Sequence, residues 1–281
     1  MKIAETVAEV RQQVKAWRKE GLTVGLVPTM GYLHEGHQSL IAKACEQNDR
    51  VVVSVFVNPT QFGPNEDLES YPRDLEHDAA LCESTGAALI FHPTPAEMYP
   101  KGFCSFVDMD VLTKELCGLS RPVHFRGVCT VVTKLFNIVT PDRAYFGEKD
   151  FQQLAIIREM VRQLKYNLEI VGCSIVREED GLALSSRNKR LSAEERENAL
   201  NISRTLFKSR NFAATHTVSE TQKMVEDAIE AAPGLRMEYF EIVDGNTLQK
   251  ISNWEDTSYA VGCITVFCGE VRLIDNIKYK E

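Results

Sequence analysis

Apolar residues follow two alternating patterns over the first 176 positions of the chain. The segment at residues 6–21 places Val7, Val10, Val14 and Trp17 on one helical face. Similar helical patterns cover residues 36–47, 73–85, 128–139 and 150–164. Short apolar runs, typical of buried strands, lie at residues 22–27, 50–57, 87–92, 143–146 and 168–176. Strands that alternate with helices predict an α/β fold with a parallel sheet.

The pattern changes after residue 176. Two amphipathic helices are predicted at residues 191–210 and 219–232, and Ser192 with Glu195 has the spacing of a capping box. The tail is strand-like at residues 237–244, 258–267 and 270–277. The sequence therefore predicts a larger domain at residues 1–176 and a smaller α+β domain at residues 177–281, and 281 residues are enough for both.

Charge and composition narrow the possible partners. The net charge of −8 disfavours extended contact with nucleic acid, although a small anion could bind in a locally basic pocket. No apolar run has the length of a membrane helix, and the opening residues MKIAETVAEVRQQ do not resemble a secretory signal. The eight cysteines are scattered without a C-x-x-C pair, so we interpret most of them as core residues. We expect a cytoplasmic protein that binds neither nucleic acid nor membrane.

One motif stands where the first predicted sheet strand gives way to a helix. It reads PTMGYLHEGH at residues 28–37. Gly36 allows a ligand to approach the backbone closely, and the N–H groups at a helix start favour anions. His34 and His37 can donate hydrogen bonds to phosphate oxygens, and the positive helix end favours neutral imidazoles. A pair of ordinary turn histidines is the alternative, but both histidines together with the glycine and this position favour a phosphate site.

Polar loops follow three further predicted strands, and ligands of open parallel sheets bind beyond the carboxyl ends of strands. These loops carry Asn58 and Gln61, then Lys149 and Asp150, then Ser185, Ser186 and Arg187. Lys149 and Arg187 suit phosphate groups. Asp150 could orient Lys149, hold a metal or cap the helix that follows.

Other loops are weaker signals. Asn58 and Gln61 would be ordinary turn residues if they stood alone, and RPVHFRGV at residues 121–128 is by default a solvated charged loop. No P-loop, dinucleotide fingerprint or Ser/His/Asp nucleophile set is evident. The polar groups present bind and neutralise phosphate, which is how phosphoryl and nucleotidyl transfers are catalysed.

Five stretches together resemble the pantothenate synthetase (pantoate–β-alanine ligase) family of the nucleotidylyltransferase superfamily. They are PTMGYLHEGHQSLI, VSVFVNPTQFGPNEDLESYPRD, RPVHFRGVCTVV, FGEKDFQQL and ALSSRN. The resemblance implies a Rossmann-like parallel sheet of the nucleotidylyltransferase type and a smaller C-terminal domain that covers the site. It also implies a homodimer.

The resemblance further implies a reaction. ATP, accompanied by Mg²⁺, would activate pantoate as pantoyl adenylate, and β-alanine would then give pantothenate and AMP. His34, His37, Lys149 and Arg187 would be catalytic, with His37 a candidate general acid. The implied ATP site consists of Met30, Gly31, Tyr32, Leu33, His34, Glu35, Gly36, His37, Gly147, Glu148, Lys149, Asp150, Val176, Leu184, Ser185, Ser186 and Arg187. Pantoate would contact Gln61 and Gln153, with Asn58 and Arg126 nearby, Gln61 would also border β-alanine, and no protein metal site is implied.

Three other functions remain open at this point. A nucleotidylyltransferase acting on another small phosphate or carboxylate substrate would use the same histidine motif and basic loop. A non-catalytic nucleotide-binding module is disfavoured because Lys149, Arg187 and both histidines are present. A role in handling tRNA is the weakest alternative, given the acidic net charge.

Overall fold

The computed structural model describes residues 1–64 and 66–281, so Asn65, which lies within one of the quoted motifs, is outside the described residues. It divides into two compact units. The first unit contains Met1–Asp110, Arg121–Glu148 and Ile156–Ser174. The second contains Val111–Ser120, Lys149–Ala155 and Ile175–Glu281. Two short segments, Val111–Ser120 and Lys149–Ala155, therefore belong to the second unit although the chain on both sides of each belongs to the first.

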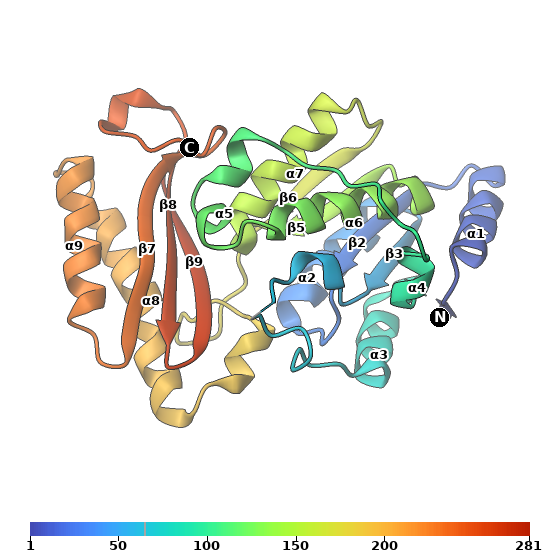
Figure 1. Cartoon of the computed structure of the whole chain (residues 1–281), viewed down its shortest axis with the longest axis horizontal. Helices are drawn as coiled ribbons and strands as arrows, with labels where there is room; N and C mark the ends of the chain where they lie inside the picture. Colours follow the sequence, from blue (N-terminus) through green and yellow to red (C-terminus); the bar gives the residue numbers. More distant parts are fainter. Residues whose placement is uncertain (65) are drawn as a thin grey trace. The chain divides into compact units, whose positions relative to one another are not determined.

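The first unit is built on a parallel sheet, as predicted (Figure 1). Its strands are β1 (Lys2–Ala4), β2 (Val24–Thr29), β3 (Arg50–Val55), β4 (Leu89–Phe91), β5 (Arg143–Gly147) and β6 (Glu169–Cys173). Among the described residues these six form one sheet in the order β1-β4-β3-β2-β5-β6. The chain moves from β2 outward to β3 and β4 and then returns to β5 on the other side of β2. The loops after β2 and β5 therefore leave the sheet from neighbouring strands, at the switch point where open α/β sheets bind ligands.

Helices cover both faces of this sheet. They are α1 (Val7–Lys19), α2 (Glu35–Gln47), α3 (Leu75–Thr85), α4 (Pro95–Met98), α6 (His124–Val139) and α7 (Phe151–Gln163). Right-handed crossovers in this strand order place α2 and α3 on one face and α1 and α6 on the other. Alternate strand residues such as Val27, Val53 and Ile90 pack in one buried cluster with Leu40 and Ile41 of α2. The hydrophobic periodicity that predicted the helices and strands thus also determines which face of each one is buried.

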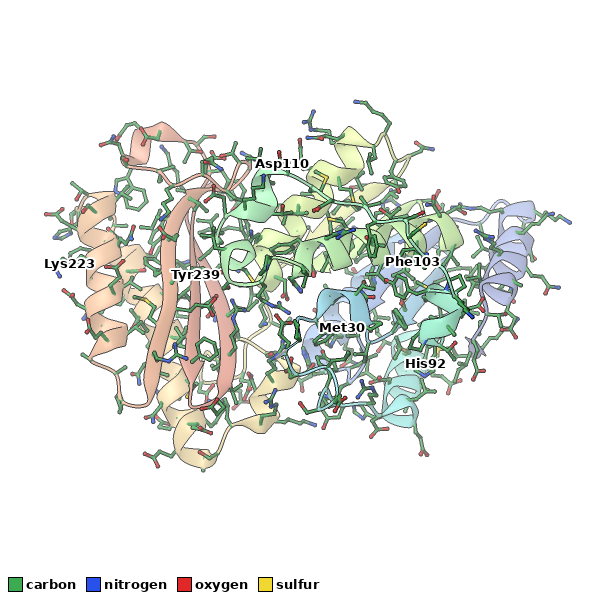
Figure 2. All side chains as sticks on the ribbon, in the orientation of Figure 1. Met30, His92, Phe103, Asp110, Lys223 and Tyr239 are labelled. Carbon is green, nitrogen blue, oxygen red and sulfur yellow. The ribbon has the colours of Figure 1, made fainter. Side chains whose placement is uncertain are left out.

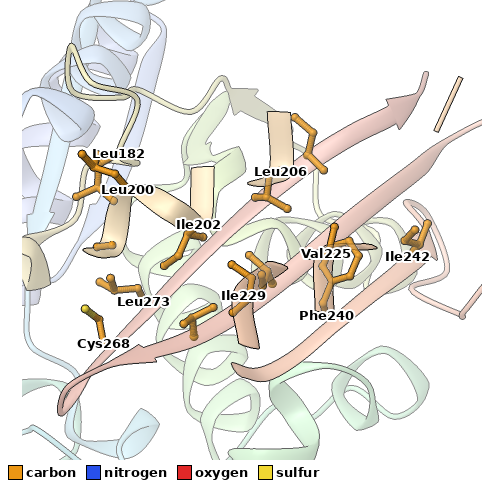
Figure 3. Close-up of a cluster of buried hydrophobic side chains, with 14 of the residues drawn as sticks. Leu182, Leu200, Ile202, Leu206, Val225, Ile229, Phe240, Ile242, Cys268 and Leu273 are labelled. Carbon is orange, nitrogen blue, oxygen red and sulfur yellow. The ribbon is translucent and has the colours of Figure 1, made fainter. Parts of the chain in front are cut away.

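The second unit is an α+β unit. It contains α8 (Ala193–Phe212), α9 (Val218–Glu230), β7 (Leu235–Asp244), β8 (Ala260–Cys268) and β9 (Val271–Lys280). The strands form an antiparallel sheet in the order β7-β8-β9. Ser192 and Glu195 form the expected capping box of α8. Side chains from both helices, including Leu206 and Val225, pack on strand residues such as Phe240 to form its core (Figure 3).

The two earlier segments join this second unit through a separate apolar cluster. Leu116, next to α5 (Cys117–Ser120), and Phe151 at the start of α7 pack with Val243, Val261 and Cys263 of the antiparallel sheet. Gln152 is buried between them: its amide oxygen accepts from the backbone N–H of Cys117 at 3.0 Å, and its nitrogen donates to two backbone carbonyls of the same segment. The first turn of α7 is therefore held by the second unit.

The structure differs from the sequence-based prediction in three places. The edge strand β1 was missed, because it has three residues of which only Ala4 is buried. The loop predicted at residues 93–105 contains α4, which Thr94 caps and Pro95 starts. The default interpretation of residues 121–128 as a solvated loop was wrong, because α6 already begins at His124, which is buried. None of the described helices is long and apolar enough to span a membrane.

Candidate active site

The loop after β2 enters α2 through two consecutive left-handed residues. Gly31 has φ 82° and Tyr32 has φ 52°. The second is uncommon for a residue with a side chain and costs conformational energy. Asp78 of α3 holds this turn, because its carboxylate accepts the N–H groups of Tyr32 and Leu33 at 2.8 and 2.7 Å. The turn thus has a fixed shape that its own sequence would not impose.

Asp78 is enclosed by the loop that it holds. Asp78 is only 1% exposed. Burial raises the pKa of its carboxyl group, although the hydrogen bonds from the two N–H groups act to lower that pKa. A Cβ atom on Gly31 would lie 2.9 Å from the Asp78 Oδ2 atom, so glycine is required there for space as well as for φ. The neighbouring His77 places Nε2 3.0 Å from the carbonyl oxygen of Leu33. Sequence reasoning missed both residues; the available signal was an aspartate four positions before Cys82, on the buried side of α3.

His34 and His37 form a reciprocal capping arrangement at the start of α2. The His34 Nδ1 atom accepts the N–H of Gly36 at 3.1 Å, and the His37 Nδ1 atom accepts the N–H of His34 at 3.3 Å. A ring nitrogen that accepts a hydrogen bond carries no proton, so the neutral rings carry their proton on Nε2. The two ring centroids are 4.1 Å apart. The backbone thereby presets both imidazoles as Nε2–H donors at a helix N-terminus, where anions are favoured.

Asn58 and Gln61 lie in a buried hydrogen-bonded group that follows β3. Asn58 precedes η1 (Pro59–Gln61), and the two residues are 1% and 7% exposed. The Asn58 amide nitrogen donates to Gln61 Oε1 at 3.0 Å, and the Gln61 amide nitrogen donates to the sulfur of Met30 at 3.0 Å. The loops after β2 and β3 are thus in direct contact. The structure therefore places Asn58 and Gln61 in one hydrogen-bonded group.

The start of α6 contacts this group and carries Arg126. The His124 Nδ1 atom lies 3.0 Å from the carbonyl oxygen of Gln61. Arg121 makes a two-pronged ion pair with Glu66. Burial acts to raise the pKa of Glu66, but the hydrogen bonds and charge of Arg121 outweigh it, so the pKa is lowered. The guanidinium of Arg126 stacks 4.0 Å from the centre of the Phe106 ring.

Gly147 and Glu148 are the last of the predicted site residues that belong to the first unit. Gly147 ends β5, next to β2, and Glu148 begins η3 (Glu148–Asp150). Lys149 and Asp150 follow in the second unit, where the Lys149 carbonyl oxygen accepts from the Asn276 side chain at 3.1 Å. Asp150 is exposed and directly precedes α7.

Gln153, Val176 and the residues from Leu184 to Arg187 also belong to the second unit. Gln153 is half-buried in the first turn of α7. Val176 and Leu184 face each other across a tight hairpin, with the Leu184 N–H donating to the Val176 carbonyl oxygen at 3.0 Å. Ser185 then caps η4 (Ser186–Arg190), because its hydroxyl accepts the N–H of Arg187 at 3.3 Å. The backbone of the predicted SSR segment is therefore preset like that of the histidine motif.

Charged residues outside the quoted motifs hold this hairpin in place. Arg177 makes two hydrogen bonds to the Asp275 carboxylate of β9, at 2.7 and 2.9 Å. Arg196 of α8 pairs with Glu178 at 2.6 Å and with Asp180 at 2.7 Å. Sequence reasoning did not single out these residues. The run REED after β6 was the available signal, since acidic residues in a turn predict ion pairs with basic residues nearby.

The fold and these preset groups define an α/β nucleotide-binding protein with a histidine-bearing helix start at the switch point of its sheet. The sequence profile of the pantoate-beta-alanine ligase family matches residues 2–278. The chain belongs to that family, and the ligase predicted from the motifs is confirmed.

Similar proteins span the whole chain. A pantothenate synthetase from Bacteroides thetaiotaomicron is 67% identical over 281 residues, with 100% of each chain covered. The crystal structure of pantothenate synthetase from Thermus thermophilus has a TM-score of 0.93 at 47% identity, again with 100% of each chain covered. The pantoate-beta-alanine ligase from Francisella tularensis, solved in complex with beta-gamma ATP and beta-alanine, has a TM-score of 0.82 at 34% identity and covers 99% of this chain and 98% of its own. These structures have the same fold, which confirms the predicted fold class.

Proposed function

We propose that this chain joins pantoate to β-alanine through pantoyl adenylate, at the expense of ATP. Membership of the ligase family supports the overall reaction. ATP and β-alanine are also the molecules named for the related Francisella structure. The observation in this chain that carries the proposal is the capping arrangement of His34 and His37, which presets two neutral donors at a helix start.

In the first step a pantoate carboxylate oxygen attacks the α-phosphorus of ATP, and the bond from that phosphorus to the bridging oxygen breaks to release pyrophosphate. We assign His34 and His37 to the phosphates, with His37 as the candidate general acid. Lys149 and Arg187 neutralise the charge that develops on the phosphate oxygens, an interaction that strengthens towards the transition state. In the second step the β-alanine amine attacks the acyl carbon, loses a proton and displaces AMP.

The remaining ATP contacts are assigned on family resemblance. They are Met30 to His37, Gly147 to Asp150, Val176, and Leu184 to Arg187. For pantoate we assign Gln61 and Gln153, with Asn58 and Arg126 beside them. A neutral amide suits a small hydroxy acid, because it binds oxygen atoms without trapping the nucleophilic carboxylate in an ion pair.

Mg²⁺ is proposed to arrive with ATP. The exposed carboxylate of Asp150, beside Lys149, is a hard oxygen donor of the kind that fits an ion otherwise held by phosphate oxygens and water. Mg²⁺ on the phosphates would offset their negative charge. We also propose a homodimer and a C-terminal domain at residues 177–281 that acts as a lid, both on family resemblance. A cytoplasmic location is consistent with eight cysteines that are all free thiols.

Isotope exchange tests the order of the two steps. With pantoate and Mg²⁺ present and β-alanine absent, the protein should exchange labelled pyrophosphate into ATP. Exchange should disappear without pantoate, since the carboxylate is the nucleophile. Exchange that requires β-alanine, or that proceeds without pantoate, would contradict the proposal and favour a nucleotidylyltransferase with another substrate.

Lys149→Ala locates one residue in this sequence of steps. The variant should slow the exchange severely but should affect amide formation from pre-made pantoyl adenylate much less, because pyrophosphate has already left. Lys208→Ala removes an exposed lysine of α8 and serves as the matched control. Equal slowing of both half-reactions by Lys149→Ala would show that Lys149 does not act on the phosphates in the first step.

A further inference from the structure

Gln61 belongs to a chain of buried hydrogen bonds that starts at a backbone carbonyl and ends at Met30. The carbonyl oxygen of Gly127, in the first turns of α6, accepts from the Asn58 amide nitrogen at 3.2 Å. The same nitrogen donates to Gln61 Oε1 at 3.0 Å, and Gln61 Nε2 donates to the Met30 sulfur at 3.0 Å. Figure 2 labels Met30, at the far end of this chain.

The backbone carbonyl determines which way both amides point. A carbonyl oxygen can only accept, so the Asn58 atom beside Gly127 must be the nitrogen, and the oxygen of that amide must point the other way. The Gln61 atom that faces the Asn58 nitrogen must then be an oxygen. It follows that Gln61 turns its oxygen inward and its two N–H groups away from Asn58.

Tyr99 fixes the other side of Asn58. Its hydroxyl donates to Asn58 Oδ1 at 2.6 Å, and the Thr60 hydroxyl donates to the same oxygen at 3.0 Å. Burial raises the pKa of Tyr99, so this hydroxyl keeps its proton. The ring makes an edge contact with Phe103, which Figure 2 labels, at a distance of 5.0 Å between ring centroids. The Lys134 ammonium lies over the same ring, 5.2 Å from its centroid. Tyr99 is thus a rigid donor that opposes rotation of the Asn58 amide.

Gly127 is required for the close approach of these segments. A Cβ atom there would lie 2.3 Å from the Thr60 carbonyl oxygen and 2.5 Å from the Gln61 Cα atom. Every residue in this group belongs to the first unit. The group therefore has a fixed geometry within one compact part of the chain.

We propose that Tyr99 is a positioning residue that acts through Asn58 to hold Gln61 so that the N–H not bonded to Met30 is directed at an acceptor oxygen atom of pantoate. This inference rests on the proposed function, in which Gln61 binds pantoate. Tyr99 itself need not touch the substrate. Its hydroxyl stabilises the amide orientation that the Gly127 carbonyl sets. A rotated Gln61 would present a carbonyl oxygen to an accepting oxygen of the substrate and repel it.

Tyr99→Phe tests the proposal, because it removes only the hydroxyl and keeps the ring contacts. We expect the KM for pantoate to rise about threefold to thirtyfold, the range for one lost hydrogen bond to a buried polar group. The KM for ATP and the kcat at saturating pantoate should stay within about twofold to threefold of the wild-type values.

Tyr145→Phe is the matched control. Tyr145 is a fully buried tyrosine of β5 in the same unit, and its hydroxyl bonds Asn48 and Gln47 at 2.7 and 2.9 Å, away from Gln61. This variant should lose stability in thermal unfolding without a change in the KM for pantoate. An equal rise in KM in both variants would show a general structural effect and overturn the proposal, as would an unchanged KM in Tyr99→Phe.

A double-mutant cycle separates positioning from direct contact. If Tyr99 acts through Gln61, Tyr99→Phe should cost nothing further in a Gln61→Ala background, measured as kcat/KM for pantoate, which needs no saturation. The same fold-loss in both backgrounds would mean that Tyr99 acts independently, and the proposal would be wrong. Absence of pantoate-dependent exchange in the wild-type protein would instead refute the proposed function.

Discussion

Asp78→Asn tests the view that a buried carboxylate holds the loop before the histidines. The carboxylate accepts the N–H groups of Tyr32 and Leu33 with separate oxygens, so an asparagine can satisfy one of them and must direct its own NH₂ group at the other. Leaving one buried N–H without an acceptor lowers the free energy of unfolding by about 1–3 kcal/mol. Removing a buried charge offsets part of this loss. We expect the free energy of unfolding to fall by about 2 kcal/mol.

The same change should slow catalysis. Tyr32 is held at φ 52° with the help of Asp78, and a released loop can relax towards commoner conformations and displace His34. Displacements of about 1 Å at such sites cost up to about a hundredfold in rate, so we expect pyrophosphate exchange to fall about tenfold to a hundredfold.

Urea unfolding and the exchange assay measure the two effects. Asp74→Asn is the matched control, because Asp74 caps the same helix from an exposed position and asparagine caps equally well. It should stay within about 0.5 kcal/mol of the wild-type protein with normal exchange. If Asp78→Asn behaved like Asp74→Asn in both assays, the carboxylate would not be what holds the loop.

Two further predictions concern the surroundings of Gln61. Gly127→Ala should lower the free energy of unfolding by about 1–3 kcal/mol in urea titrations and weaken pantoate binding in calorimetry, because its Cβ would overlap the backbone of Thr60 and Gln61; normal pantoate affinity would argue against this close packing. Glu66→Gln should lower the thermal unfolding midpoint near pH 7, because Arg121 keeps the pKa of Glu66 below its ordinary 4.5 and the stabilisation is present above that value. This advantage of the wild-type protein should shrink as the pH falls below 4.5 and through the lowered pKa, and an advantage that did not depend on pH would contradict the assignment.

The sequence predicted the sheet and suggested the candidate site loops because both inferences depend on local patterns. Apolar periodicity shows which segments are strands and which are helices, and the polar loops are recognised because each follows a strand. The edge strand β1 was beyond this reasoning, since Lys2 and Ile3 are exposed and leave almost no apolar pattern. The charged start of α6 was misinterpreted because buried His124 and paired Arg121 look the same in sequence as solvated residues.

The supporting contacts of the site could not be predicted, because they join residues far apart in the chain. Asp78 is a surface-type residue by composition, and only the folded loop shows that it accepts the N–H groups of Tyr32 and Leu33. Tyr99 lay in a segment predicted to be a loop, with no sign of its bond to Asn58. The motifs supplied the groups that we assign to ligands, whereas the residues that orient those groups became visible only through contacts.

The membership of the first turn of α7 in the second unit has a consequence for synthesis on the ribosome. Phe151 and Leu116 are buried by Val243 and Val261, which are translated about a hundred residues later than Phe151. A nascent chain that has not yet emerged through β8 already contains the complete histidine motif, but its Lys149 turn has no apolar support. Until then Phe151 and Leu116 lack the residues that bury them, and a chain translated only to residue 176 would never acquire those residues.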